Sequence, residues 1–214
     1  MKTCTVARRL LLTAICLHGA GSLRADEPLT LSNELVDCRW TLDEGRIAAL
    51  ELTNKHTGQT LRLQGGHLPR IVLDDGRIVD LAALAPAVPV DRKGNLLTAA
   101  FKDDGSGLEI RWSAILNDAA NHLVQTLQLI AGRDTKIKEL VFVDTRIEEA
   151  KQVGRVDGSV VVCGDVFLAV EHPLAKNTVD KNSHVRCALP RGNVLATGGT
   201  WRYTSVFGVV EPGR

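Results

Sequence analysis

A carboxylate and an imidazole stand side by side where a short apolar segment of the sequence ends. Glu171 and His172 follow five consecutive apolar residues (166–170) and precede Pro173. A neighbouring acid and base can share proton-transfer work or bind sugar hydroxyls. Side chains of adjacent strand residues point to opposite faces, so both reach one pocket only if the turn at Pro173 rotates them. Two interpretations stay open: a ligand-facing loop, or a strand-end pair that bonds to residues 174–182.

The other histidines and the acid pairs do not form reactive groups at recognisable spacing. His67 lies in a glycine-rich loop and could either project into a cleft or be solvated, whereas His56, His122 and His184 have no neighbours at metal-ligand spacing. The Asp pairs at 74–75 and 103–104 each precede glycine, which is typical of turns. We therefore expect no metal ion and no cofactor.

Two aromatic side chains near the end of the sequence could bind a sugar ring. Trp201 and Tyr203 are two residues apart, so they share one face of a strand. Such a pair can form a stacking platform or can pack into a core, and the sequence does not decide between these roles.

The elements that must position these groups are short strands. Apolar and polar residues alternate over 108–116, and turn residues such as Asp43-Glu44-Gly45 separate neighbouring apolar segments. The proline-containing stretch 82–90 cannot be a central strand and is expected to be a crossing loop. About a dozen such segments predict an all-β fold, a large antiparallel β-sandwich over residues 26–214.

The first 25 residues have the pattern of a secretory signal peptide. Basic residues come first, an apolar segment (10–17) follows, and small residues such as Ser22 and Ala25 offer cleavage sites. The apolar segment is too short to span a bilayer, so we expect a secreted or periplasmic protein without a membrane partner. Lys and Arg number 26 against 25 for Asp and Glu, which gives no reason to expect nucleic acid as a partner.

Three cysteines remain after the predicted signal peptide. They are Cys38, Cys163 and Cys187, and an odd number permits at most one intramolecular disulfide. The favoured pair is Cys163 with Cys187, because both lie in predicted neighbouring strands. Three buried thiols that act as small apolar groups are the alternative.

Several segments resemble the end of an N-terminal domain in bacterial glycoside hydrolases of the α-galactosidase-like, or enterotoxin-like, kind. They are Asp165 to Asn177, Arg186-Cys187-Ala188-Leu189-Pro190, Gly198-Gly199-Thr200 and the stretch from Phe207 to Gly213. The resemblance implies a β-supersandwich of the galactose-mutarotase-like type, followed in that family by a (β/α)8 barrel that carries both catalytic carboxylates.

The sequence departs from that family where the barrel would follow. It ends at Arg214, so we expect a truncated chain without the catalytic barrel, and no catalytic residue can be carried over. The resemblance implies that the sandwich contributes one loop to a sugar pocket. Glu171, His172 and Asn177 are the carbohydrate-facing residues we expect in that loop.

The leading functional hypothesis is a non-catalytic, carbohydrate-associated module of a glycoside hydrolase. Its expected partners are a carbohydrate and a catalytic barrel on a separate chain. One alternative is a mutarotase or sugar epimerase, which needs a Glu and a His that converge on one face. Another is an exported structural domain that binds a second polypeptide.

Overall fold

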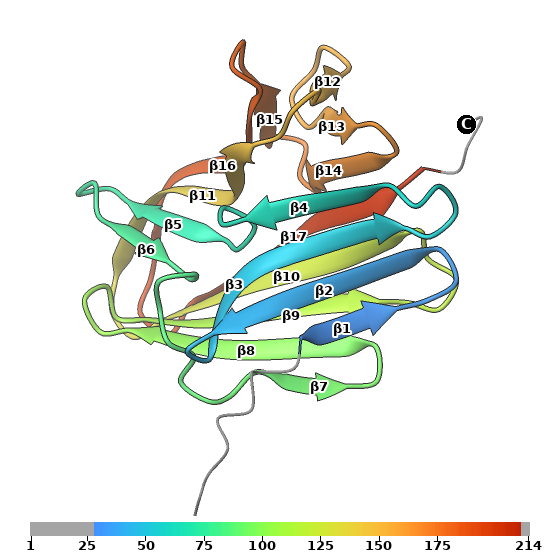
Figure 1. Ribbon diagram of the computed structural model, residues 1–214. Helices are drawn as coiled ribbons and strands as arrows, with labels where there is room; N and C mark the ends of the chain where they lie inside the picture. Colours follow the sequence, from blue (N-terminus) through green and yellow to red (C-terminus); the bar gives the residue numbers. More distant parts are fainter. Residues whose placement is uncertain (1–27, 211–214) are drawn as a thin grey trace, which may run out of the picture.

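The computed structural model describes residues 28–210, and within this range the chain is entirely β-structure with turns. Seventeen strands form three antiparallel sheets, and the four-stranded one packs over the largest (Figure 1). The predicted large antiparallel β-sandwich is therefore confirmed. Between Pro28 and Val210 there is no helix of the length and apolar character that a membrane crossing requires. The predicted signal peptide lies outside the described residues.

The largest sheet has eight strands and forms one layer of the sandwich. Its spatial order is β12-β13-β14-β17-β10-β9-β8-β7. The bounds, in that order, are Lys151–Val153, Val160–Cys163, Val166–Val170, Thr200–Val209, His122–Ala131, Leu108–Leu116, Leu96–Asp103 and Asp91–Lys93.

Two smaller sheets complete the fold. The four-stranded sheet lies across the face of the large sheet (Figure 1) and consists of β1 (Leu29–Ser32), β2 (Val36–Asp43), β3 (Arg46–Asn54) and β4 (Thr60–Gln64). The five-stranded sheet has the order β15-β16-β11-β5-β6, with bounds Lys176–Val179, His184–Leu195, Thr135–Arg146, Arg70–Leu73 and Ile78–Asp80. The Asp144 amide donates to the Gly66 carbonyl (3.0 Å), which ties the loop after β4 to β11.

Alternation of side chains explains how the strands of the large sheet bury one face. β9 and β10 each alternate between buried and more exposed residues along most of their length. The buried face carries Trp112, which meets Trp40 of β2 edge to face with ring centroids 6.2 Å apart. The Trp112 indole nitrogen donates to Gln125 Oε1 (3.0 Å), so its polar atom is satisfied within the core.

β11 is covered on both sides in its central part. The four consecutive residues from Leu140 to Val143 are all buried. Irregularities in the pairing with β16, between Ile137 and Glu139 and between Val141 and Val143, adjust which side chains face each layer.

Four short strands, β1, β7, β12 and β15, were not predicted from the sequence. Each of them is an edge strand of its sheet, and β7 and β12 form the two edges of the large sheet. Both edge strands have three residues, all exposed. Their sequences, Asp-Arg-Lys and Lys-Gln-Val, carry no apolar alternation that could identify them.

The favoured disulfide is absent from the structure, in which all three cysteines are free thiols. Cys163 pairs with Val166 on β14 of the large sheet, whereas Cys187 lies in β16 of the five-stranded sheet. The two residues therefore belong to different sheets, which the sequence could not reveal. Burial raises the pKa of the Cys187 thiol to about 12 and also raises the pKa of Cys38, so both remain protonated at neutral pH.

Candidate functional site

Glu171 and His172 lie directly after β14, as predicted, but their side chains have different surroundings. Glu171 is exposed, and its amide donates to the Thr204 carbonyl (3.0 Å). His172 is half-buried, and its ring meets Tyr203 edge to face at 6.1 Å. Its Nδ1 accepts the Leu174 amide (3.1 Å). The imidazole thus supports its own turn and has one nitrogen left for other partners.

Asn177 lies in β15 and not in a loop, which corrects the placement of residues 174–182 in one continuous loop. Its side chain is 1% exposed, and its Oδ1 accepts the Val170 amide (3.3 Å). Its Nδ2 has no hydrogen-bond partner among the described residues. Backbone pairing of Asn177 with Cys187 of β16 explains the strand, although its sequence has no apolar alternation. The Asn177 side chain therefore fixes the end of β14 from beneath.

We expect Asn177→Ala to lower the free energy of unfolding by about 1–2 kcal/mol, because the buried Val170 amide loses its acceptor. Urea unfolding followed by tryptophan fluorescence measures this loss. Thr178→Ala on the exposed side of the same strand is the control and should cost less than about 0.5 kcal/mol. Equal losses in the two variants would contradict the assigned support role.

Trp201 and Tyr203 form a small cluster with an arginine on the neighbouring sheet. The two rings lie 6.3 Å apart, edge to face. The Arg191 guanidinium lies over both rings, 4.8 Å from the Trp201 centroid and 5.3 Å from that of Tyr203. Burial raises the pKa of Tyr203, and the Arg191 charge opposes this shift. Because the guanidinium occupies the ring faces, the cluster joins β16 to β17 more than it offers an open platform.

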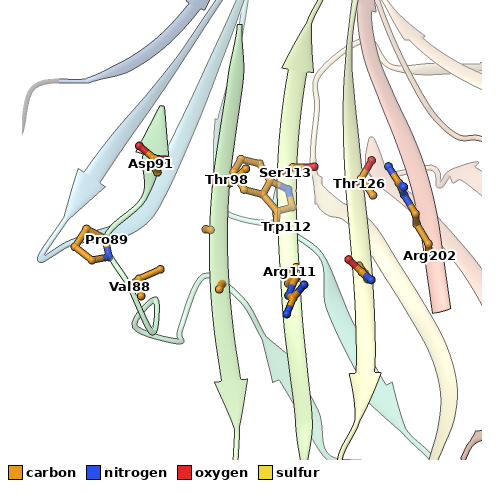
Figure 2. A pocket seen from close by; sticks show the side chains of 12 residues that line it. Val88, Pro89, Asp91, Thr98, Arg111, Trp112, Ser113, Thr126 and Arg202 are labelled. Atoms are coloured by element: carbon orange, nitrogen blue, oxygen red, sulfur yellow. The ribbon is translucent and has the colours of Figure 1, made fainter. Parts of the chain in front are cut away.

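A cleft of about 310 Å³ lies on the outer face of the large sheet, and we call it the sheet cleft (Figure 2). One wall is apolar and consists of Val88 and Pro89, with Asp91 of the edge strand β7 beside them. Its floor is polar and comes from β8, β9, β10 and β17. The polar floor residues are Thr98, Arg111, Ser113, Thr126, Gln128 and Arg202.

The floor residues form two parallel rows because the strands are in register. One row crosses three strands, since Gln128 of β10 is paired with Arg111 of β9 and with Arg202 of β17. The second row consists of hydroxyl groups from β8, β9 and β10, because Ser113 pairs with both Thr98 and Thr126. The sheet cleft thus combines guanidinium, amide and hydroxyl groups with an apolar wall, a typical composition for a small-ligand site.

Sequence analysis did not identify the sheet cleft, although part of the signal was present. Alternation in 108–116 places Arg111 and Ser113 on the polar face. The missing information is the strand order, because β17 must return to lie beside β10 before Arg202 can join the row. Val88 and Pro89 come from the predicted crossing loop, whose path was also unknown.

A second imidazole–carboxylate pair joins three strands of the five-stranded sheet. Asp144 Oδ1 lies 2.9 Å from His184 Nε2, and Arg70 donates to the other oxygen of the same carboxylate. These residues belong to β11, β16 and β5, which are neighbours in the sheet. The Arg70 charge compensates Asp144, so the pair is best explained as a cross-strand tie.

His67 has neither of the surroundings considered for it. Its side chain is fully buried, and neither ring nitrogen forms a hydrogen bond within the described residues. Burial lowers the pKa of His67 to about 4, an effect that the nearby Gly65 backbone opposes. The imidazole is thus a neutral core group at physiological pH.

No protein-family model matches the sequence, and no curated protein matches it either. Solved structures of glycosidases do share its fold. One is the α-N-acetylgalactosaminidase NagBb from Bifidobacterium bifidum in complex with GalNAc, with a TM-score of 0.59 at 12% identity. It is matched over 86% of this chain and 36% of its own.

The α-galactosidase from Lactobacillus brevis is another solved structure with this fold. The TM-score is 0.51 at 8% identity, over 89% of this chain and 40% of that one. This chain therefore spans well under half the length of either glycosidase. At such identities the likeness establishes a shared antiparallel β-sandwich, the fold of a part of both enzymes.

Proposed function

We propose that this β-sandwich is a non-catalytic, carbohydrate-associated module of a glycoside hydrolase, and that its sheet cleft is a site for a sugar. The observation that carries the proposal is the floor of the cleft, where three hydroxyl side chains and three nitrogen donors face one cavity beside an apolar wall. Sugars present hydroxyl groups around an apolar ring edge, so both parts of the cleft have a counterpart on such a ligand.

The small number of carboxylates in the sheet cleft supports a binding role and not a hydrolytic one. Glycoside hydrolysis ordinarily uses two carboxyl groups that flank the scissile bond. Among the described residues that line the sheet cleft, Asp91 is the sole carboxylate, and Lys93 Nζ lies 3.6 Å from it. A sugar epimerase would need a Glu and a His at one site, and neither residue type lines this cleft.

The glycosidases that share the fold support a place beside a catalytic domain. In this proposal a catalytic barrel, in the same or another polypeptide, completes the enzyme. In the same proposal, the turn after β14 is the part of the sandwich nearest to the sugar pocket of the barrel. Exposed Glu171 and the free nitrogen of His172 face the carbohydrate there, and buried Asn177 holds the turn in place.

The proposal predicts sugar binding without turnover by the purified sandwich. We expect galactose and N-acetylgalactosamine to shift amide resonances of β8, β9 and β10 in a titration, with dissociation constants on the order of millimolar. An aryl α-galactoside should be hydrolysed no faster than in buffer. Polarimetry on fresh α-D-galactose should likewise show no acceleration.

Variants of the cleft distinguish the possible outcomes of this experiment. Thr126→Val removes a floor hydroxyl and should weaken sugar binding several-fold. Thr178→Val, at an exposed position of β15 in another sheet, should leave sugar binding unchanged. Hydrolysis that a single carboxylate substitution abolishes would overturn the non-catalytic assignment, and resonance shifts confined to other surfaces would remove the sugar site from this cleft.

A further inference from the structure

The row Arg111–Gln128–Arg202 places an arginine on the strand to either side of Gln128. Gln128 faces both arginines directly across the strands. Neighbouring strands lie about 4.8 Å apart, so the Cα atoms of the two arginines are about 10 Å apart. Arginine side chains are long enough for both heads to reach a small group held above Gln128.

The two arginines differ in how their charge is compensated. Arg111 donates twice to Glu109 Oε1, from Nε (2.9 Å) and Nη2 (2.7 Å). Arg202 forms no ion pair and no side-chain hydrogen bond with any residue from 28 to 210, although it lines the cleft and is exposed. Arg202 therefore gives the floor one positive charge that no described residue pairs with.

The remaining charged group of the cleft does not neutralise Arg202. Asp91 belongs to β7 at the far edge of the sheet, and the strands β8, β9 and β10 lie between it and β17 (Figure 2). Its nearest cation is Lys93. The positive charge therefore lies at one end of the floor, on the strand beside Gln128 and two residues along β17 from the position opposite Thr126. The Arg202 side chain extends toward Thr126 in the hydroxyl row (Figure 2).

We infer that the sheet cleft selects an acidic sugar, one whose carboxylate or sulfate oxygens bind between Arg202 and Gln128 while its hydroxyl groups meet Ser113 and Thr126. This inference rests on the proposed sugar site and adds its substrate class. A guanidinium can donate two parallel hydrogen bonds to a carboxylate or sulfate, which neutral hydroxyl groups cannot match.

Isothermal titration with matched ligands tests the inference. We expect galacturonate or galactose 6-sulfate to bind about ten-fold more tightly than galactose, an advantage that shrinks as sodium chloride rises from about 50 to about 500 mM. Arg202→Gln should abolish this advantage, so that this variant binds galactose and the acidic sugars with equal affinity. Arg155→Gln, at an exposed arginine in the turn after β12, is the matched control and should change nothing.

The outcomes separate this inference from the proposed function. Equal affinity for galactose and both acidic sugars, unaffected by Arg202→Gln, would refute the acidic-sugar class and leave the sugar site standing. No binding of any sugar would refute both. Sodium sulfate alone binding as tightly as galactose 6-sulfate would show a simple anion site and refute the sugar contacts, whereas preference for one acidic sugar over the other identifies the anionic group.

Discussion

Trp112→Ala will lower the free energy of unfolding by about 4 kcal/mol, among the largest losses that one substitution can cause in this chain. The side chain is 1% exposed, and it packs against Trp40 of the opposing sheet. Its removal opens a cavity between the layers and leaves Gln125 Oε1 buried without its donor. Urea unfolding followed by far-ultraviolet circular dichroism measures the effect.

Two further variants make the Trp112 prediction specific. Trp112→Phe keeps a ring but loses the indole donor, and we expect its free energy of unfolding to fall by about 1–2 kcal/mol. This variant tests the prediction even if Trp112→Ala fails to fold. Trp201→Ala deletes the same side chain where it is only half-buried and should cost about half as much as Trp112→Ala. Equal losses for Trp112→Ala and Trp201→Ala would show that the two layers do not meet at Trp112.

Acidification from pH 6.5 to pH 4 will remove about 3 kcal/mol of stability through His67 alone. Burial lowers the pKa of this imidazole from 6.5 to about 4 in the folded protein. As the pH falls below 6.5, His67 becomes protonated in the unfolded chain but stays neutral in the folded protein. Acidification therefore favours unfolding. The contribution is complete above pH 6.5 and is lost progressively down to pH 4.

His67→Leu isolates this contribution from that of the carboxylates. The variant should be at least as stable as the parent at pH 7, because both ring nitrogens are buried without partners. Its free energy of unfolding should fall about 3 kcal/mol less than the parent's between pH 6.5 and pH 4. His56→Leu, at an exposed histidine, is the control and should follow the parent. Parallel pH profiles for the parent and His67→Leu would contradict the assignment.

Local alternation predicted most of the fold because long strands with one buried face carry their own signal. β9 is the clearest example, with Leu108, Ile110 and Trp112 on the buried face and Glu109 and Arg111 on the other. β15 shows the limit of such reasoning. Its sequence Lys-Asn-Thr-Val has no apolar alternation, and it becomes a strand only because β16 offers a partner.

The candidate site was harder to predict than the fold because it depends on neighbours far apart in the sequence. Glu171 and His172 were found at a strand end, as expected, since Pro173 has a strong local effect. The row formed by Arg111, Gln128 and Arg202 exists only because β10 lies between β9 and β17. Nothing in the sequence near Arg202 indicates that its side chain shares a surface with Arg111.

The short charged strands at both edges of the eight-stranded sheet have a consequence for how the molecule behaves in concentrated solution. An open edge exposes unpaired amide and carbonyl groups that can recruit a strand from another molecule, and so begin aggregation. An incoming strand would meet only the charged residues Asp91, Arg92 and Lys93 along β7, and β12 begins with Lys151. Burying these charges against an incoming chain is unfavourable, so the wide sheet can end in solvent without seeding fibres.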